Sequence, residues 1–118
     1  MLNCAIECKN KTLPRDIQEL HLKIRDDKNF DIIPFFQQAN DFINQARLAG
    51  GNILIHCKLG ISRSAAIAIA YLIKYYGFDF LSAMNFIKKQ RDRINPNTGF
   101  VEQLKKYENI VRNNIKKK

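Results

Sequence analysis

The chain has 118 residues, of which 46% are hydrophobic and 26% are charged, and its formal net charge is +9. This length supports one hydrophobic core and argues against two, so we expect a single domain over residues 1–118. The longest uninterrupted apolar run, residues 65–73, is too short to cross a bilayer, so we expect no transmembrane segment.

Three short segments favour β-strands. Residues 2–6 are mostly apolar, residues 20–24 alternate apolar and polar side chains, and residues 52–55 end in a branched apolar run. A polar loop, residues 25–29, follows the second of these segments. Because open α/β sheets build their sites at the C-terminal ends of strands, this loop is a candidate part of a site.

Four segments favour helices, and the first two are defined by their ends and their apolar residues. Asp31 can cap the first helix, with Pro34 in its first turn, and the pair Gly50 and Gly51 ends it. Residues 64–73 are apolar almost all round, which predicts a helix in the covered middle of the fold. In the first helix, helical spacing places five residues on one apolar face: Phe35, Ala39, Phe42, Ile43 and Ala46.

The other two helices follow Gly77, which is a natural C-terminal cap for the apolar helix. Asp79 or Ser82 starts the third helix, and residues 95–99 form a turn before the fourth. All the elements together predict an α/β fold in which helices flank a small central sheet. The inward-facing residues of these two helices are Phe80, Ala83, Met84 and Ile87, and Phe100, Leu104, Tyr107 and Val111.

The stretch His56–Ser64 lies between the third strand and the apolar helix. A strand, a tight turn and a helix N-terminus bring successive backbone N–H groups around one point. Six such groups, from Lys58 to Arg63, can surround a tetrahedral oxyanion, and Gly60 relieves the backbone where a side chain would collide. We therefore predict an anion-binding cradle here.

Three side chains make this cradle a candidate site for phosphoryl transfer. Arg63 supplies a permanently charged, two-pronged donor that fits two phosphate oxygens. The positive field favours the thiolate of Cys57 and makes it a nucleophile, and His56 is placed to hydrogen-bond the loop backbone from behind. The residues that we expect to contact the phosphate are Lys58, Leu59, Gly60, Ile61, Ser62 and Arg63.

The letters HCKLGISRS, at residues 56–64, resemble the signature of the cysteine-dependent protein phosphatases in their dual-specificity branch. The resemblance continues through residues 65–73 and 94–108, and back through residues 24–43, so it covers nearly the whole chain. The signature loop is particularly similar to that of the slingshot-type phosphatases.

This resemblance implies a role for four residues. Cys57 matches the nucleophile that becomes phosphocysteine, and Arg63 matches the phosphate-binding arginine. Ser64 matches the hydroxyl that stabilises the cysteine thiolate when it leaves. Asp26 matches the general acid that protonates the leaving group and then activates water. Spacing alone does not separate Asp26 from its neighbour Asp27, and the family register favours Asp26.

Two further expectations come from the family pattern. The chain starts at what resembles the third family strand, so we expect a cysteine-dependent phosphatase fold that is shortened at its N-terminus. We expect either a compact shortened domain or self-association that covers an exposed strand edge. Asn97 also matches a family position, and we interpret it as turn and helix-cap chemistry.

We expect neither a metal nor a cofactor, because no group of Cys, His and Asp residues has metal-ligand spacing. No secretory leader is visible, so we expect free thiols in a reducing compartment, the cytoplasm or the nucleus, with Cys4 and Cys8 as packing residues. The segment 105–118 holds six basic residues and one acid, which is typical of a solvated helix and also suits an acidic partner.

Three functions stay open. The first is hydrolysis of phosphotyrosine and of phosphoserine or phosphothreonine in proteins. The second keeps the chemistry on a phosphoinositide or an RNA 5′-phosphate, although Ile61 stands where lipid-directed relatives commonly have a second lysine. The third is a phosphate-binding module with little turnover.

Overall fold

The computed structural model describes residues 2–3, 20–49, 55–56, 62–90 and 92–116, and the fold and the site are described from these residues. Three strands of two residues each form a parallel sheet: β1 (Leu2–Asn3), β2 (Leu20–His21) and β3 (Ile55–His56). The strand β1 lies in the middle, in the order β2-β1-β3. Its residue Leu2 is in register with Leu20 on one side and with Ile55 on the other.

The second strand is shorter than the alternating pattern of residues 20–24 predicts. Leu22 and Ile24 are buried, as the pattern requires, but they lie outside β2. The amide of Ile24 donates to the carbonyl of Leu22 at 2.9 Å, so the chain turns locally and does not continue the ladder. At these two residues the alternating pattern therefore predicts burial correctly but not strand pairing. Residues 4–6 and 52–54 of the other predicted strands lie outside the described residues.

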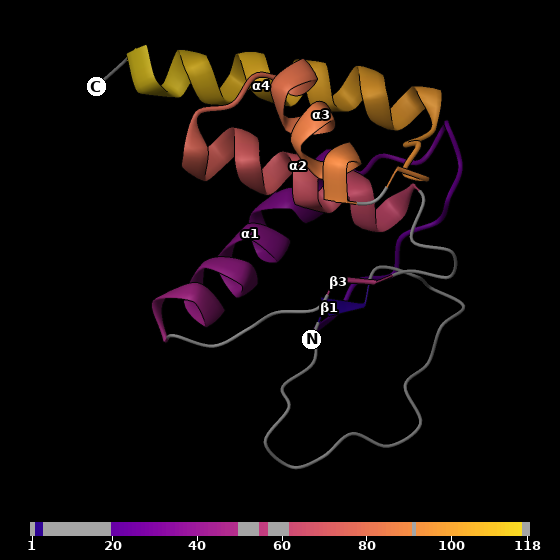
Figure 1. Cartoon of the computed structure of the whole chain (residues 1–118), viewed down its shortest axis with the longest axis horizontal. Coiled ribbons are helices and arrows are strands. Elements are labelled where there is room, and N and C mark those ends of the chain that lie inside the picture. Colours follow the sequence, from indigo (N-terminus) through magenta and orange to yellow (C-terminus); the bar gives the residue numbers. More distant parts are fainter. Residues whose placement is uncertain (1, 4–19, 50–54, 57–61, 91, 117–118) are drawn as a thin grey trace.

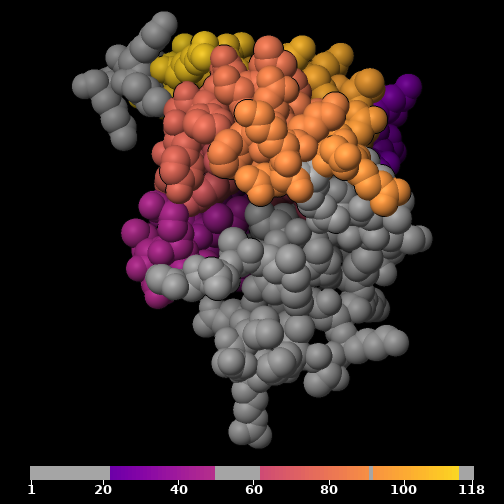
Figure 2. Space-filling model, viewed as in Figure 1, coloured from indigo at the N-terminus to yellow at the C-terminus, as the bar shows by residue number. Residues whose placement is uncertain are grey.

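Four helices make up most of the described structure. They are α1 (Ile33–Leu48), α2 (Arg63–Tyr76), α3 (Phe80–Gln90) and α4 (Thr98–Lys116). The helix α2 lies between the others and contacts all three of them, with α1 on one side and α3 and α4 on the other (Figure 1). In Figure 2, α2, α3 and α4 form one continuous packed surface above α1.

The central position of α2 follows from its composition and confirms the prediction of a covered helix. Side chains point to the core all round it, so its burial is not confined to one stripe. The buried apolar residues of α2 are Ala65, Ala66, Ile67, Ile69, Ala70, Tyr71 and Ile73. The helix ends at Gly77, whose φ of 70° confirms the predicted left-handed cap.

The first helix differs from its prediction at its start and on its buried face. Ile32 and not Asp31 is its N-cap, and it makes no side-chain cap hydrogen bond. The fully buried phenylalanine is Phe36, whereas Phe35 is only half-buried. Of the predicted apolar face, Ala39 and Ile43 are buried and Phe35 and Phe42 pack partly buried against the core, whereas the pattern missed the buried polar Asn40. The buried residues of α1 are Phe36, Ala39, Asn40 and Ile43.

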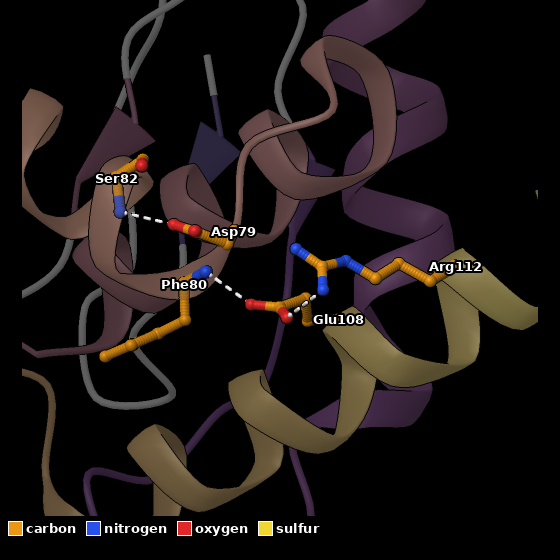
Figure 3. Close-up of polar contacts among 5 residues, drawn as sticks. All are labelled: Asp79, Phe80, Ser82, Glu108 and Arg112. Atoms are coloured by element: carbon orange, nitrogen blue, oxygen red, sulfur yellow. Dashed lines mark hydrogen bonds and ion pairs between the residues drawn. The ribbon is translucent and has the colours of Figure 1, made fainter.

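The caps of α3 and α4 agree with the sequence. Asp79 Oδ1 accepts a hydrogen bond from the amide of Ser82 at 2.7 Å, so Asp79 and not Ser82 caps α3 (Figure 3). Asn97 Oδ1 accepts one from the amide of Phe100 at 2.9 Å, which confirms Asn97 as the cap of α4. Among the described residues, no helix combines the length and the apolar character that a membrane crossing needs.

Candidate active site

Residues 62–64, the last part of the signature stretch His56–Ser64, are buried at the start of α2. Ser62, Arg63 and Ser64 are only 5%, 6% and 6% exposed. A buried guanidinium requires acceptors, and Arg63 Nη1 donates to the carbonyl oxygen of Ile24 at 3.1 Å. Arg63 is therefore bonded to the backbone two residues before Asp26.

Several of the predicted site residues lie outside this description. The predicted nucleophile Cys57 and the loop residues Lys58, Leu59, Gly60 and Ile61 are not among the described residues. They fall between the last residue of β3, His56, and the start of α2.

Asp26 lies on an exposed segment that leads from β2 toward α1. We call residues 25–32 the acid loop. Asn97 Nδ2, at the start of α4, donates a hydrogen bond to Asp26 Oδ1 at 3.0 Å. The same residue reaches the signature stretch, because its backbone amide donates to Ser62 Oγ at 3.0 Å. Asn97 therefore connects Asp26 to the residue that immediately precedes Arg63.

This double contact of Asn97 was missed by sequence reasoning, which assigned it helix-cap chemistry alone. Its Oδ1 caps α4, while its Nδ2 donates to Asp26 and its backbone amide donates to Ser62, two residues from other parts of the chain. The match of Asn97 to a family position was the one signal that pointed beyond a cap.

Asp27, the alternative acid, is used differently. Its Oδ1 accepts a hydrogen bond from the amide of Asn29 at 2.9 Å, and its carbonyl accepts one from the amide of Phe30 at 2.9 Å. An aspartate that bonds its own backbone two residues on forms an Asx turn. Asp27 thus shapes the acid loop from within, whereas Asp26 contacts a different part of the chain.

The acid loop also packs closely on the first turn of α4. A β-carbon at Gly99 would overlap the backbone carbonyl of Lys28, so the two backbones approach closer than a side chain allows. Glycine is the residue that permits such an approach. The position of the loop therefore depends on Gly99 as well as on Asn97.

A cavity of about 530 Å³ lies between α1, α2 and α4, and its lining includes none of the predicted site residues. Within it, Asn40 Nδ2 donates to the hydroxyl oxygen of Tyr107 at 3.0 Å. Burial raises the pKa of Tyr107 above its ordinary value, and the bond from Asn40 opposes that rise. The phenol is therefore protonated at neutral pH, and its hydrogen bond with Asn40 joins α4 to α1.

The comparisons with known proteins agree with this geometry. Residues 1–110 match the family model "Dual specificity phosphatase, catalytic domain", so the chain belongs to the dual-specificity phosphatase family. It is 40% identical over 108 residues to human dual specificity protein phosphatase 18, covering 92% of this chain and 57% of that protein. It is 35% identical over 111 residues to mouse protein phosphatase Slingshot homolog 3, covering 94% of this chain and 17% of that protein.

The chain also shares its fold with solved phosphatases. A mouse putative dual specificity phosphatase, crystallised as a complex with zinc tungstate, superimposes with a TM-score of 0.92 at 31% identity. The match covers 97% of this chain and 71% of that one. The predicted family is therefore confirmed, and over the matched residues the chain shares the fold of a dual-specificity phosphatase. The chain spans less than two thirds of the two curated relatives described above, at 57% and 17% of their lengths.

Proposed function

We propose that this chain is a phosphatase domain that hydrolyses phosphate monoesters on phosphotyrosine and on phosphoserine or phosphothreonine in proteins. The observation that carries the proposal is the pair of hydrogen bonds through Asn97, which connects Asp26 to Ser62. A carboxyl group is thereby tied to the segment that carries the phosphate-binding arginine. Membership of the dual-specificity family supports the same activity.

In the first step, the Cys57 thiolate attacks phosphorus. The bond from phosphorus to the leaving oxygen breaks as the S–P bond forms, and Asp26 gives its proton to that oxygen. Arg63 and the backbone N–H groups of residues 58–63 bind the phosphoryl oxygens. The product of this step is a phosphocysteine.

In the second step, water attacks the phosphorus of phosphocysteine. Asp26, now a carboxylate, accepts a proton from the water, and the S–P bond breaks to release phosphate. The Ser64 hydroxyl donates to the departing Cys57 thiolate, and His56 supports the loop backbone. Residues of this chain perform both steps, and neither step uses a metal.

Asp26 is the better candidate for the acid because its carboxylate is connected to the signature stretch through Asn97, whereas the carboxylate of Asp27 bonds within the acid loop. The Asx turn of Asp27 orients its Oδ1 toward the amide of Asn29. Asp26 instead faces Asn97, beside the signature residues. This difference supports the assignment of Asp26 that the family register favours.

We also propose a location and a class of partner. A catalytic thiolate needs a reducing compartment, which favours the cytoplasm or the nucleus. The exposed face of α4 carries Lys105, Lys106 and Arg112, which suit an acidic partner surface. Of these, Arg112 is paired with Glu108 at 3.3 Å. The α/β arrangement in which helices flank a small central sheet, and self-association through an exposed strand edge, also belong to the proposal, and light scattering checks the self-association.

The test is hydrolysis of an aryl phosphate by the purified chain. We expect turnover that Cys57→Ser abolishes, that Cys8→Ser leaves unchanged as a matched control, and that a chelator does not reduce. Phosphopeptides and phosphoinositides presented at equal concentration then separate the substrate classes, and we expect higher kcat/KM for phosphopeptides. Absence of hydrolysis by the folded chain would leave only phosphate binding and refute the proposal.

A further inference from the structure

The helix α1 begins without a cap from its own neighbourhood. Its N-cap residue, Ile32, has an apolar side chain, and Pro34 has no backbone N–H group to offer. The first N–H groups of a helix have no partner within it and need an acceptor from elsewhere. Gln103, in the second turn of α4, supplies one. Its Oε1 accepts hydrogen bonds from the amides of Ile32 at 2.8 Å and Ile33 at 3.3 Å.

The nitrogen of the Gln103 carboxamide also forms a hydrogen bond to the backbone. Gln103 Nε2 donates to the carbonyl oxygen of Phe30 at 2.7 Å. One side chain therefore holds the backbone on both sides of residue 31, through a donor and an acceptor at once. These three bonds are partly buried and join positions 70 to 73 residues apart.

The acid loop is thus attached to α4 along its whole length. Asn97 holds its start through Asp26, Gly99 lies against the backbone of Lys28, and Gln103 holds its end at Phe30 and Ile32. All three residues belong to the cap and first two turns of one helix. Because a helix is rigid, it transmits one fixed spacing to the three contacts.

We propose that Gln103 is a positioning residue for the general acid: by holding residues 30–33 against α4, it keeps Asp26 in its reacting position. The inference rests on the proposed phosphatase function. In this arrangement the acid is placed before substrate arrives, and α4 serves as the template for the loop. A displacement of about 1 Å at a catalytic group can cost about 10²-fold in rate, so a distant amide can control proton transfer.

Two substitutions separate this positioning from a merely structural role. Gln103→Glu keeps an acceptor for the first amides of α1, and a negative charge at a helix N-terminus is itself favourable. It removes the donor to Phe30 and sets a carboxylate against that carbonyl. Gln103→Leu removes both the acceptor Oε1 and the donor Nε2 and keeps a similar side-chain volume. We therefore expect the glutamate variant to remain folded while the acid loop is no longer held at Phe30.

The experiment measures kcat/KM for a series of aryl phosphates whose leaving groups range from good to poor. This ratio reports the first step, because the leaving group departs before phosphocysteine is hydrolysed, and in that hydrolysis Asp26 serves every substrate alike. A good leaving group needs no proton, so its kcat/KM depends little on Asp26. We expect Gln103→Glu to lower kcat/KM about tenfold for the poorest leaving group and less than about twofold for the best, a fraction of the roughly 10²–10⁴-fold that general acids contribute. For the poorest leaving group KM should change little, since the described hydrogen bonds of Gln103 are with residues 30, 32 and 33, outside the predicted phosphate cradle. The control is Gln38→Ala, which removes an exposed glutamine of α1.

Each outcome decides the inference. Unequal losses across the series in Gln103→Glu, in a chain that still unfolds cooperatively, support it. Equal losses across the series, or none, overturn it while leaving the phosphatase function intact, because the wild-type chain and Cys57→Ser report on that function separately. Failure of the folded wild-type chain to hydrolyse any member of the series overturns both. If Gln103→Leu does not fold, the glutamate variant still gives the decision.

Discussion

Asn97 Nδ2 donates to Asp26 Oδ1 at 3.0 Å, and the two residues are 71 positions apart in the chain. The contact joins the cap of α4 to the predicted general acid. The Oδ1 of the same asparagine accepts a hydrogen bond from the amide of Phe100. The helix cap therefore depends on the oxygen of the Asn97 carboxamide, and the contact with Asp26 depends on its nitrogen. A single substitution can therefore remove one of these roles and keep the other.

Asn97→Ser is the substitution that separates them. Serine remains a good N-cap, so the free energy of unfolding should stay within about 0.5 kcal/mol of wild type. Its hydroxyl is too short to replace the amide donor to Asp26, so kcat for poor leaving groups should fall about tenfold. Asn97→Ala should show the same loss of rate and also lose about 1 kcal/mol of stability. Urea denaturation and the aryl phosphate series measure the two effects, and a serine variant with full activity would refute the role of this contact.

The two neighbouring aspartates give a matched pair of isosteric changes. Asp26→Asn removes the proton donor and should lower kcat for poor leaving groups by about 10²–10⁴-fold. Asp27→Asn keeps an Oδ1 that accepts from the amide of Asn29, so the Asx turn persists and kcat should change less than about twofold. Steady-state kinetics on the same series checks both. The reverse order of effects would assign the acid to Asp27.

Gly99→Ala tests the close approach of the acid loop to α4. Alanine is favoured over glycine within a helix by about 1 kcal/mol, so an unobstructed site would gain stability. Here the new β-carbon meets the carbonyl of Lys28, and relieving that overlap should cost about 1–3 kcal/mol and displace the acid loop. Thr98→Ala, at the neighbouring exposed position, is the control. A stabilised Gly99→Ala chain in urea denaturation would contradict the prediction.

The buried Tyr71 and the half-buried Tyr107 should respond in opposite directions to loss of the hydroxyl. Among the described residues Tyr71 has no hydrogen-bond partner for its buried hydroxyl, whereas Tyr107 accepts from Asn40 at 3.0 Å. Tyr71→Phe should therefore leave stability unchanged or raise it by about 1 kcal/mol. Tyr107→Phe leaves the buried Asn40 amide without this partner and should cost about 1–3 kcal/mol. The same sign for both in thermal or urea denaturation would show that these hydrogen bonds do not control stability here.

These cases show which features a sequence can predict. The end of α2 at Gly77, the cap of α3 at Asp79 and the cap of α4 at Asn97 depend on residues within a few positions of each other. Local chemistry decides them, so local patterns find them. The burial of α2 is equally local because nearly every side chain along it is apolar.

The features that the sequence did not reveal depend on partners far along the chain. From the sequence alone, Gln103 is indistinguishable from an exposed residue of a polar helix, because its partners at residues 30–33 are about 70 positions away. Asn40 reads as the polar side of α1 until Tyr107 provides its partner. In the candidate site, the motif and its register are the basis on which Arg63 and Asp26 are predicted. The connection through Asn97 and Ser62 required the fold.

The cap of α3 is a titratable carboxylate, that of Asp79, so its contribution to stability depends on pH. The hydrogen bonds from the backbone amide and side chain of Ser82 lower the pKa of Asp79 below its ordinary value of 3.8, and Arg112 adds to the effect. Nearby, Glu108 accepts from the amide of Phe80 at 2.6 Å and pairs with Arg112, so a second carboxylate meets the same helix end (Figure 3).

Because the folded pKa of Asp79 is depressed, its carboxylate stabilises the chain above the unfolded pKa of 3.8, and this contribution is lost as pH falls through the folded pKa. Asp79→Asn keeps a good N-cap but cannot ionise. Its deficit in unfolding free energy relative to wild type should therefore be present at pH 6 and shrink on acidification. Urea denaturation of both chains across this range measures it. A deficit that is independent of pH would show that the cap acts through its shape and not through its charge.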